Sequence, residues 1–395
     1  MNKKVIEAFK KLEDYCESEN YEGWDPYDGL MSKVFKALPV LPGGKLTRLI
    51  WIQLIKKSPF NLRGVLKVDK GYNPKGLALF ISGYSNLSQI ESNHSTSVEK
   101  INYLSEKLLN LRTEGFSGSC WGYNFDWESR AFFQKQFSPT IVATTYSASA
   151  LLDAFEVTTN KNYFNAALSA KDFILNDLNR TYDSKGDFAF SYSPFDKTSV
   201  FNASLLGARL LSRIYNYTKE EELIAIAKKA VAYVCNQQNT DGSWFYSTLP
   251  FHQWIDNFHT GFNLECIYEY AKYSNDNSFK ENFEKGIDFY LKTFFDNEGR
   301  SKYYHNSLYP IDIHAPSQLI VTLAKTGLLK QYEKIADKVL SWTIENMQSP
   351  EGFFYFQKRK FYTNKIPYMR WSEAWIFYAL SFYLVNAERA LEKSS

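Results

Sequence analysis

Two aspartate–histidine pairs stand at matching places in a chain that has only five histidines. Asp256 and His259 occur in "WIDNFHTGF", and Asp312 and His314 occur in "YPIDIHAPS", each just before an expected helix. The positive end of a helix dipole favours a neutral imidazole, and a nearby aspartate can hold one tautomer of that ring. Such a ring can act as a general base. We therefore predict that these four residues carry acid/base chemistry, although the two aspartates also suit helix caps.

Further polar and aromatic side chains occur in the loops expected to arrive beside these pairs, whereas polar residues look sparse along the apolar helices. Helix N-termini with unpaired N–H groups make such a place slightly positive, which suits carboxylated or phosphorylated sugars. We predict a substrate-binding set from these loops. It comprises Asn257, Arg370, Trp371, Glu373, Trp121, Asp126, Tyr304 and His305.

Three kinds of function fit these residues. A glycoside hydrolase needs two carboxylates across the site, and the four acidic residues named above are candidates. A lyase or epimerase needs a base beside an acidified sugar carbon and a group that neutralises the sugar carboxylate. One of the two histidines, with Tyr304, Asn257 and Arg370, would supply these groups. A protein without catalysis would use the same side chains to bind a sugar chain or an assembly partner.

Motifs for metals, redox chemistry and nucleotides are absent from the sequence. The four cysteines (Cys16, Cys120, Cys235 and Cys266) are far apart and form no CxxC pair, so we expect small buried thiols. There is also no glycine-rich phosphate loop. We expect neither a metal nor a cofactor.

The composition is that of an ordinary globular chain with an aromatic excess. Of the 395 residues, 45% are hydrophobic, 23% charged and 17% aromatic. Aromatic rings suit a cleft that binds sugars, and they equally suit the filling of a large helical core. The net charge of +3 argues against general nucleic-acid binding. The first 18 residues lack a secretory signal and no stretch is long enough to span a membrane, so we expect a cytoplasmic protein.

The elements that must position these residues are helical hairpins. Runs that are apolar on all sides recur about every 55–60 residues, which predicts buried helices, and each is followed by an amphipathic run, which predicts a half-exposed helix. Glycine-bearing aromatic turns, such as "NTDGSWFYS", follow the amphipathic runs. We predict an all-α fold of six hairpins, in which helix 2–18 closes the ring. The expected inner helices are 77–87, 143–155, 201–215, 260–270, 315–325 and 372–384.

This pattern resembles the (α/α)6 toroid. The "DGSW" turn after Gln237 and Gln238 looks like the QW repeat of squalene-cyclase-like toroids, and phrases such as "SPFNLRGVLKV" and "IDNFHTGFNLE" resemble toroid proteins of bacterial exopolysaccharide and capsule clusters. The resemblance implies one toroid over 77–395 with N-terminal helices over 1–76 packed on it. It also implies a carbohydrate-active enzyme that processes a cell-surface polysaccharide or its precursor. A terpene cyclase is disfavoured because no DxDD or DDxxD motif occurs.

The N-terminal region holds a basic amphipathic segment. Residues 45–76 carry a net charge of +7. Within 45–67, Leu46, Leu49, Ile50, Leu54 and Ile55 share one helical face that ends at Lys56 and Lys57. Such a helix can lie on an anionic membrane at the inner face, close to lipid-linked sugars. The alternative is a helix packed on the toroid with its lysines in water.

Overall fold

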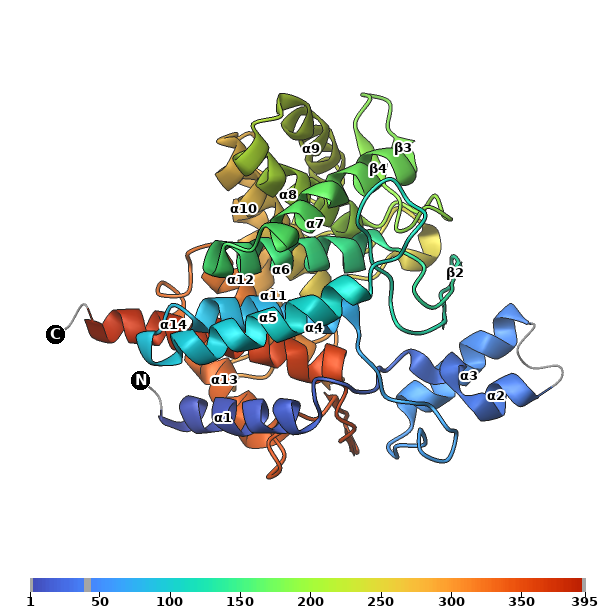
Figure 1. The fold of residues 1–395 in the computed structure, drawn as a ribbon, viewed down its shortest axis with the longest axis vertical. Helices are drawn as coiled ribbons and strands as arrows, with labels where there is room; N and C mark the ends of the chain where they lie inside the picture. The colour runs from blue at the N-terminus through green and yellow to red at the C-terminus, as the bar shows by residue number, and fades with distance from the viewer. Residues whose placement is uncertain (1–2, 39–43, 393–395) are drawn as a thin grey trace.

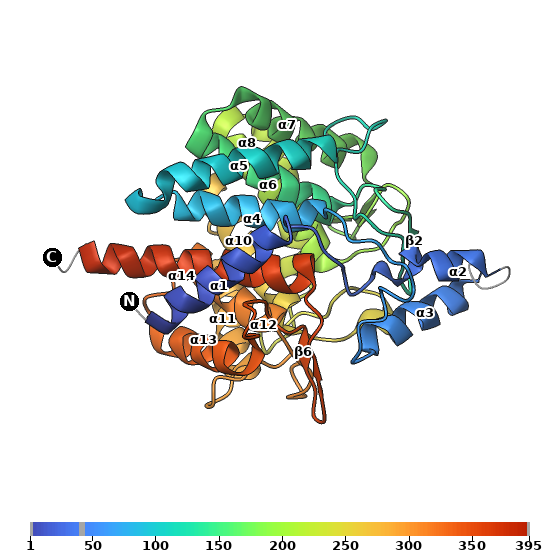
Figure 2. The ribbon, with the colours of Figure 1, turned by 60° about the horizontal axis from the view of Figure 1, so that its bottom comes forward.

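The computed structural model describes residues 3–38 and 44–392, and within them twelve helices form two concentric rings. Figures 1 and 2 show these helices from the side. Neighbouring inner helices pack on one another all the way round, and α14 returns to α4. The inner ring comprises α4 (Pro74–Leu87), α6 (Ile141–Thr158), α8 (Phe201–Thr218), α10 (Asn257–Ser274), α12 (His314–Lys325) and α14 (Ala374–Glu392). The outer ring comprises α1 (Lys3–Ser18), α5 (His94–Asn110), α7 (Lys161–Asp172), α9 (Glu221–Cys235), α11 (Lys280–Phe294) and α13 (Glu333–Met347).

The predicted ring of six hairpins is therefore present. Residues 141–148 of α6 and 201–212 of α8 are buried without interruption, because outer helices cover one side and the other inner helices cover the rest. An outer helix such as α9 buries only one face, through Leu223, Ala227 and Val231. The first inner helix begins at Pro74 instead of 77, where Asn73 caps it by accepting a hydrogen bond from the Lys75 amide. Residue 2 of the predicted helix 2–18, and residues 1–2, 39–43 and 393–395 of the predicted regions, lie outside the described residues.

The prediction that polar residues are sparse along the inner helices is wrong. Arg209 of α8 lies 3.9 Å from Glu265 and 3.5 Å from Glu269, both on α10. Lys325 of α12 approaches the same two carboxylates at 3.9 and 3.5 Å. Each charge looks isolated within its own apolar run, but three helices bring the charges together at the ring centre, where they pair.

Helix α1 occupies the sixth outer position and is held there by a glutamine-bearing turn of a kind that also occurs between α9 and α11. After α9, the Gln238 side-chain amide donates to the carbonyls of Gly242 and of Asn282 on α11. After α13, the Gln348 amide donates in the same way to the carbonyls of Gly352 and of Ala8 on α1. Gly352 has a positive φ of +104°, and a Cβ there would stand 2.2 Å from the Lys11 carbonyl oxygen. The turn can therefore reach α1 only as glycine.

Short antiparallel strands connect the hairpins at the end of the ring where the inner helices begin. β1 pairs with β2, β3 with β4, and β5, β6 and β7 form one small sheet in that order. The strands are β1 (Trp127–Glu128), β2 (Phe133–Gln134), β3 (Arg180–Tyr182), β4 (Phe188–Phe190), β5 (Ile311–Asp312), β6 (Gln357–Lys358) and β7 (Thr363–Asn364). β5 places Asp312 directly before α12.

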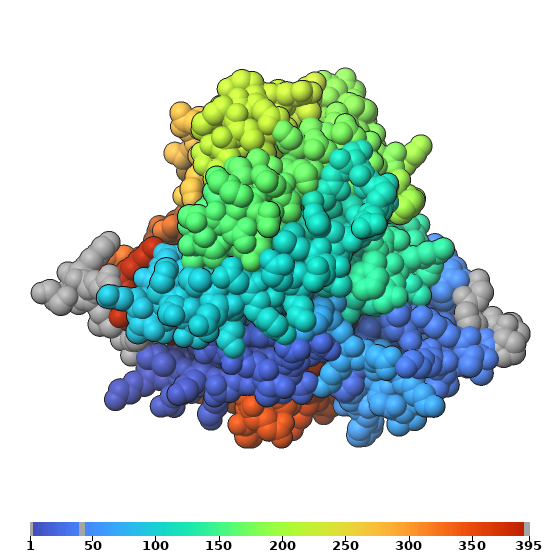
Figure 3. Space-filling model, viewed as in Figure 1, coloured from blue at the N-terminus to red at the C-terminus, as the bar shows by residue number. Residues whose placement is uncertain are grey.

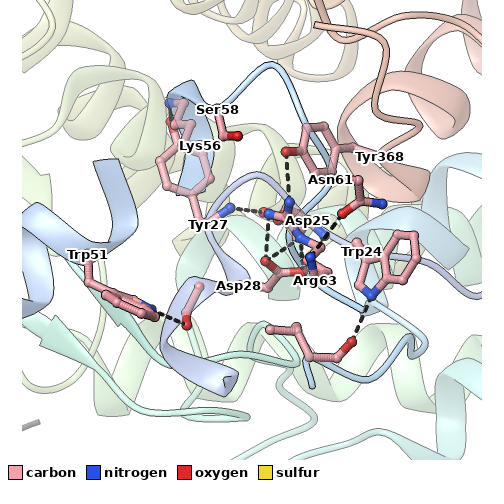
Figure 4. Close-up of polar contacts among 12 residues, drawn as sticks. Trp24, Asp25, Tyr27, Asp28, Trp51, Lys56, Ser58, Asn61, Arg63 and Tyr368 are labelled. Carbon is pink, nitrogen blue, oxygen red and sulfur yellow. Dashed lines mark hydrogen bonds and ion pairs between the residues drawn. The ribbon is translucent and has the colours of Figure 1, made fainter. Parts of the chain in front are cut away.

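Residues 19–38 and 44–73 form an extension that projects beside this end of the ring (Figure 2), and it holds the short helices α2 (Lys33–Ala37) and α3 (Lys45–Lys57). Figure 3 shows α1 and the extension, in dark and lighter blue, along one side of the molecule. Arg63 of the "SPFNLRGVLKV" segment attaches the extension to the ring through the polar contacts drawn in Figure 4, and its side chain is fully buried. Its guanidinium forms an ion pair with Asp28 and donates to the Tyr368 hydroxyl (3.0 Å) and the Asp25 carbonyl (2.7 Å).

Because α1 completes the outer ring and Arg63 is buried between the extension and residue 368, we propose that the predicted regions 1–76 and 77–395 form one domain.

Replacement of Gly352 by alanine should loosen the closure of the ring. The positive φ costs about 1–2 kcal/mol for any residue with a Cβ, and the clash with the α1 backbone adds about 1–3 kcal/mol. Gly186→Ala is the matched control, because Gly186 also has a positive φ (+81°) but open space around its Cβ position. Thermal unfolding should show the larger loss for Gly352→Ala, and faster amide exchange in α1. Equal losses in the two variants would contradict this account of ring closure.

Candidate functional site

The inner helices begin at one end of the ring, the right-hand end in Figure 1, and we call this end the mouth. Both aspartate–histidine pairs lie there. The Phe258 ring contacts the His259 ring at 4.5 Å between centroids and stacks on the His314 ring at 4.4 Å. Segments separated by more than fifty residues thus share one opening, as ring closure requires.

Asp256 both caps α10 and holds the His259 ring. One carboxylate oxygen accepts from the His259 backbone amide at 3.0 Å. The other lies 2.7 Å from His259 Nδ1 and accepts from Trp254 Nε1 at 2.9 Å. Because a carboxylate only accepts, Nδ1 carries the hydrogen, which leaves Nε2 as the nitrogen that can exchange a proton with a ligand. The cap and the dyad, which the sequence presented as alternatives, are made by the same carboxylate.

A narrow cavity that is partly open to solvent lies against this dyad. The side chains that line it come from α8, α10 and the loop before α10: Asn202, Trp244, Phe245, Tyr246, Trp254, Asp256, His259, Thr260 and Asn263. Tyr246 and Trp254 stack face to face at 4.6 Å and form an aromatic wall. The side-chain oxygens of Asn202 and Asn263 are buried without a partner among the described residues. Free amide oxygens beside an aromatic wall suit the hydroxyl groups and ring faces of a sugar.

Asp312 does not hold the His314 ring, so the predicted second dyad is wrong. Its carboxylate accepts from the His314 backbone amide, from Trp371 Nε1 (2.9 Å) and from the Gln357 side chain (2.6 Å). A spacing of two residues lets the carboxylate reach the backbone but directs the imidazole inward. There the His314 ring packs between Phe258 and Trp375, and both of its nitrogens lack a partner in the described part of the chain.

Electrostatics also distinguish His314. Burial first, and then the charges of Lys75, His259 and Arg370, hold the pKa of His314 well below 6.5. The ring is therefore neutral. Burial also raises the pKa of Asp312 above its usual range.

Arg370 reaches the mouth but is not free to bind substrate as predicted. Its guanidinium is buried and forms a bidentate ion pair with Asp25, at 2.5 and 2.9 Å. The Arg370 guanidinium carbon also lies within 5.3 Å of the Tyr123 and Trp371 ring centroids. Trp371 itself stands at the mouth, where its ring contacts Phe258 and His314. The ion pair with Asp25 holds the Arg370 guanidinium beside the Trp371 ring.

Three predicted binding residues lie away from the cavity. Trp121 is fully buried and its Nε1 donates to the Leu108 carbonyl at the end of α5, because the turn tryptophan packs on the outer helix. Glu373 is fully buried and accepts from the Phe354 amide, and burial raises its pKa well above 4.5. Asp126 accepts from the Gln136 amide and faces Lys36 at 3.8 Å. Packing and local turns account for all three.

Of the remaining predicted residues, Tyr304 and His305 lie at the mouth, whereas Asn257 packs toward the outer ring. Tyr304 is half-buried and its backbone pairs with that of Asp256, while burial and the Asp256 charge raise its pKa to about 12. His305 lies 3.3 Å through Nδ1 from the Ile255 carbonyl oxygen. Asn257 is fully buried and accepts from the Tyr290 hydroxyl (3.0 Å), which ties α10 to α11.

Several residues of the mouth were missed by sequence reasoning. Asn202, Asn263 and Lys75 lie within or at the start of apolar runs, where a polar residue signals a buried partner or a ligand. Lys56 was assigned to a membrane face, yet its ammonium lies 4.0 Å from the Tyr27 ring centroid and 5.8 Å from that of Trp371. A polar residue inside an apolar run was the signal that could have identified the first three.

The described residues contain no group of three or more His, Cys, Asp or Glu side chains placed to hold a metal ion. The four cysteines are free thiols and are buried. None of the described helices is both long and apolar enough to cross a bilayer.

Comparison with known proteins identifies the architecture. No protein-family model and no curated protein matches the sequence. Solved structures do match. Cellobiose 2-epimerase from Bacillus thermoamylovorans matches with a TM-score of 0.64 at 10% identity. The match covers 98% of this chain and 100% of the epimerase chain. A sugar epimerase from a ruminal bacterium has a TM-score of 0.61 at 12% identity, with 81% and 90% covered.

A third similar structure is the family 76 glycoside hydrolase (mannosidase) of Bacteroides thetaiotaomicron, with a TM-score of 0.60 at 12% identity over 84% of this chain and 91% of that one. The chain has the (α/α)6 toroid fold. At these identities the toroid likeness extends to the fold alone.

His314→Leu should reduce the acid sensitivity of the toroid. Below pH 6.5 the histidine of the unfolded chain binds a proton that the buried ring does not bind. The free energy of unfolding therefore decreases as the pH is lowered, and this group contributes up to about 1.4 kcal/mol per pH unit. Leucine removes that contribution. The free energy of unfolding, measured with denaturant between pH 5 and 8, should therefore depend less steeply on pH in His314→Leu. Phe258→Leu, which disturbs the same stack without removing a titrating group, should shift stability equally at each pH. An unchanged slope in His314→Leu would refute the assignment.

Proposed function

We propose that this toroid is a carbohydrate-active enzyme that uses His259 as its general base. The observation that carries the proposal is the Asp256–His259 dyad beside a cavity walled by Tyr246 and Trp254. The dyad supplies a base with a fixed tautomer, and the wall and the free amide oxygens supply a surface for a sugar. The similar structures are named as sugar epimerases and a mannosidase, which agrees with this class.

Between the two reaction types, the geometry favours a lyase or epimerase over a two-carboxylate hydrolase. Asp312 and Glu373 are fully buried, and Asp126 is engaged in a turn. Asp256 is occupied by Trp254 and His259. No two of the predicted carboxylates therefore stand free on opposite sides of the cavity. A histidine base with a protonated tyrosine nearby, such as Tyr304, suits proton abstraction and return.

The substrate that we propose is a cell-surface polysaccharide or its precursor, in line with the sequence resemblance. An acidic sugar suits a mouth built from helix N-termini. The alternative is a toroid that binds a sugar chain or an assembly partner without converting it. Both use the aromatic wall, and only the enzyme requires Nε2 of His259 to stay unprotonated.

His259→Gln should abolish turnover and leave sugar affinity nearly unchanged. In deuterated water, a base that abstracts a carbon-bound proton exchanges it for deuterium, so a panel of bacterial surface oligosaccharides incubated with the protein should gain deuterium at one sugar carbon. We expect His259→Gln to lower that exchange by about 10²-fold or more. His94→Gln, on the outer helix α5, is the control. Binding without exchange or cleavage by the unaltered protein would favour the binding alternative, and full activity in His259→Gln would refute the dyad.

We also propose that the extension docks on an anionic membrane at its cytoplasmic face. Leu46, Ile50 and Leu54 of α3 stand at helical spacing and are 69%, 50% and 62% exposed. Lys45 and Lys57, at the two ends of α3, are exposed beside this stripe. An apolar stripe between cations is complementary to an anionic bilayer. Because Lys56 on the opposite side of α3 reaches Trp371, docking would bring the mouth close to lipid-linked sugars.

The double variant Leu46→Glu/Ile50→Glu should lose association with vesicles that contain phosphatidylglycerol. Sedimentation should show that the unaltered protein binds these vesicles, that salt weakens binding, and that pure phosphatidylcholine vesicles are not bound. Tyr182→Glu, at an exposed aromatic on β3, is the control and should bind as before. Absence of binding by the unaltered protein would overturn the proposal. So would a change from dimer to monomer in the double variant, because the stripe would then cover a second copy.

A further inference from the structure

A buried lysine stands at the floor of the mouth without a carboxylate partner. Lys75 lies in the first turn of α4 and is only 4% exposed. Its ammonium nitrogen is 4.3 Å from the Tyr146 ring centroid, 5.0 Å from that of Trp375 and 5.2 Å from that of Phe262. These rings come from three other inner helices. In the described part of the chain no carboxylate pairs with Lys75, although a buried ammonium ordinarily requires one.

Other unpaired polar atoms surround this ammonium. The Tyr146 hydroxyl, Trp375 Nε1 and both ring nitrogens of His314 are buried and make no hydrogen bond within the described residues. The His314 and Trp375 rings lie 4.3 Å apart, and Tyr146 packs edge-on against Trp375 at 5.7 Å. An unpaired buried polar group is unfavourable, because it has lost its hydrogen bonds with water and gained none. The ammonium and the indole N–H only donate, whereas the phenol and the neutral imidazole can each donate and accept, so donors outnumber acceptors in the cluster.

The groups around Lys75 disfavour the charged form of its side chain. Arg370 is paired with Asp25, and Glu265 is engaged by Gln318 and Thr322. Burial, followed by the charges of Arg370 and Arg209, lowers the pKa of Lys75 well below 10.5. Asp25 and Glu265 oppose this only in part. An anion beside Lys75 would favour the protonated form of its side chain and accept the unused hydrogen bonds.

We propose that Lys75, Tyr146, His314 and Trp375 form a subsite that binds the anionic group of an acidic sugar. The inference rests on the proposed carbohydrate function and names its substrate class. Phe262 of α10 contacts the rings of both His259 and His314, so the subsite adjoins the dyad. The anion would anchor the sugar at the floor while His259 faces a neighbouring part of the same ligand. A carboxylate and a phosphate share this chemistry, and the experiment separates them.

The subsite can be tested by titrating the protein with D-glucuronate, D-glucose 1-phosphate and D-glucose at matched ionic strength. The readout is the indole N–H signal of Trp375 in NMR spectra, assigned through Trp375→Phe. We expect an anionic sugar to shift this signal at concentrations about tenfold or more below those needed with glucose. A preference for glucuronate identifies a carboxylate site, and a preference for glucose 1-phosphate identifies a phosphate site.

Lys75→Met keeps the length and apolar stem of the side chain and should abolish the preference for the anion. Tyr146→Phe removes only an unpaired hydroxyl, so it should fold normally and lose a few-fold in affinity. If Lys75→Met fails to fold, the affinity of Tyr146→Phe for the anionic sugars still tests the subsite. If glucose and the anionic sugars shift the Trp375 signal at equal concentrations, the subsite is overturned and a carbohydrate function remains. The same conclusion follows if both variants keep the preference for the anionic sugars. Absence of any shift with all three sugars overturns the subsite, and deuterium exchange then decides the proposed function separately.

Discussion

Closure of the inner ring is the constraint on which the rest of the structure depends. The mouth exists only because α14 packs on α4, which places the loop before α14 beside the starts of α10 and α12. The closing hairpin is assembled from the two ends of the described chain, since the outer partner of α14 is α1. The Gln348–Gly352 turn donates a hydrogen bond to α1, as the Gln238–Gly242 turn does to α11. Without the contact between this turn and α1, α14 would have an uncovered apolar face, and Arg370 and Trp371 would lose their positions.

The two aspartate–histidine pairs illustrate how one pattern leads to two environments. A spacing of three residues places the Asp256 carboxylate over both the helix start and the His259 ring. A spacing of two leaves the Asp312 carboxylate on the backbone amide and on Trp371. His314 consequently enters the aromatic floor with its nitrogens free, beside a lysine that is also unpaired. The mouth therefore holds one imidazole that is fixed by a carboxylate and a second group of buried polar atoms without partners. The acidic sugar that we propose would contact both.

The sequence predicted the helices and their order well because each hairpin is read from local periodicity. It also located both aspartate–histidine pairs at helix starts. Pairings between distant segments were not readable. Nothing near Arg370 indicates that Asp25, 345 residues away, neutralises it. Nothing near Glu373 distinguishes a carboxylate in the mouth from one in the core. Lys75 was counted with a basic surface segment, although it closes the floor of the ring. Burial of a charge depends on which helices face it, and that is set by the closed ring.

The most direct test of the account is a structure determined with a bound acidic oligosaccharide. The account predicts a sugar ring against Tyr246 and Trp254, a polar or C–H group of that sugar at Nε2 of His259, and a carboxylate or phosphate at Lys75. Occupation of a different surface, or a mouth that stays free of ligand when solution binding is saturated, would contradict the central claim that the ends of the inner helices form the sugar site.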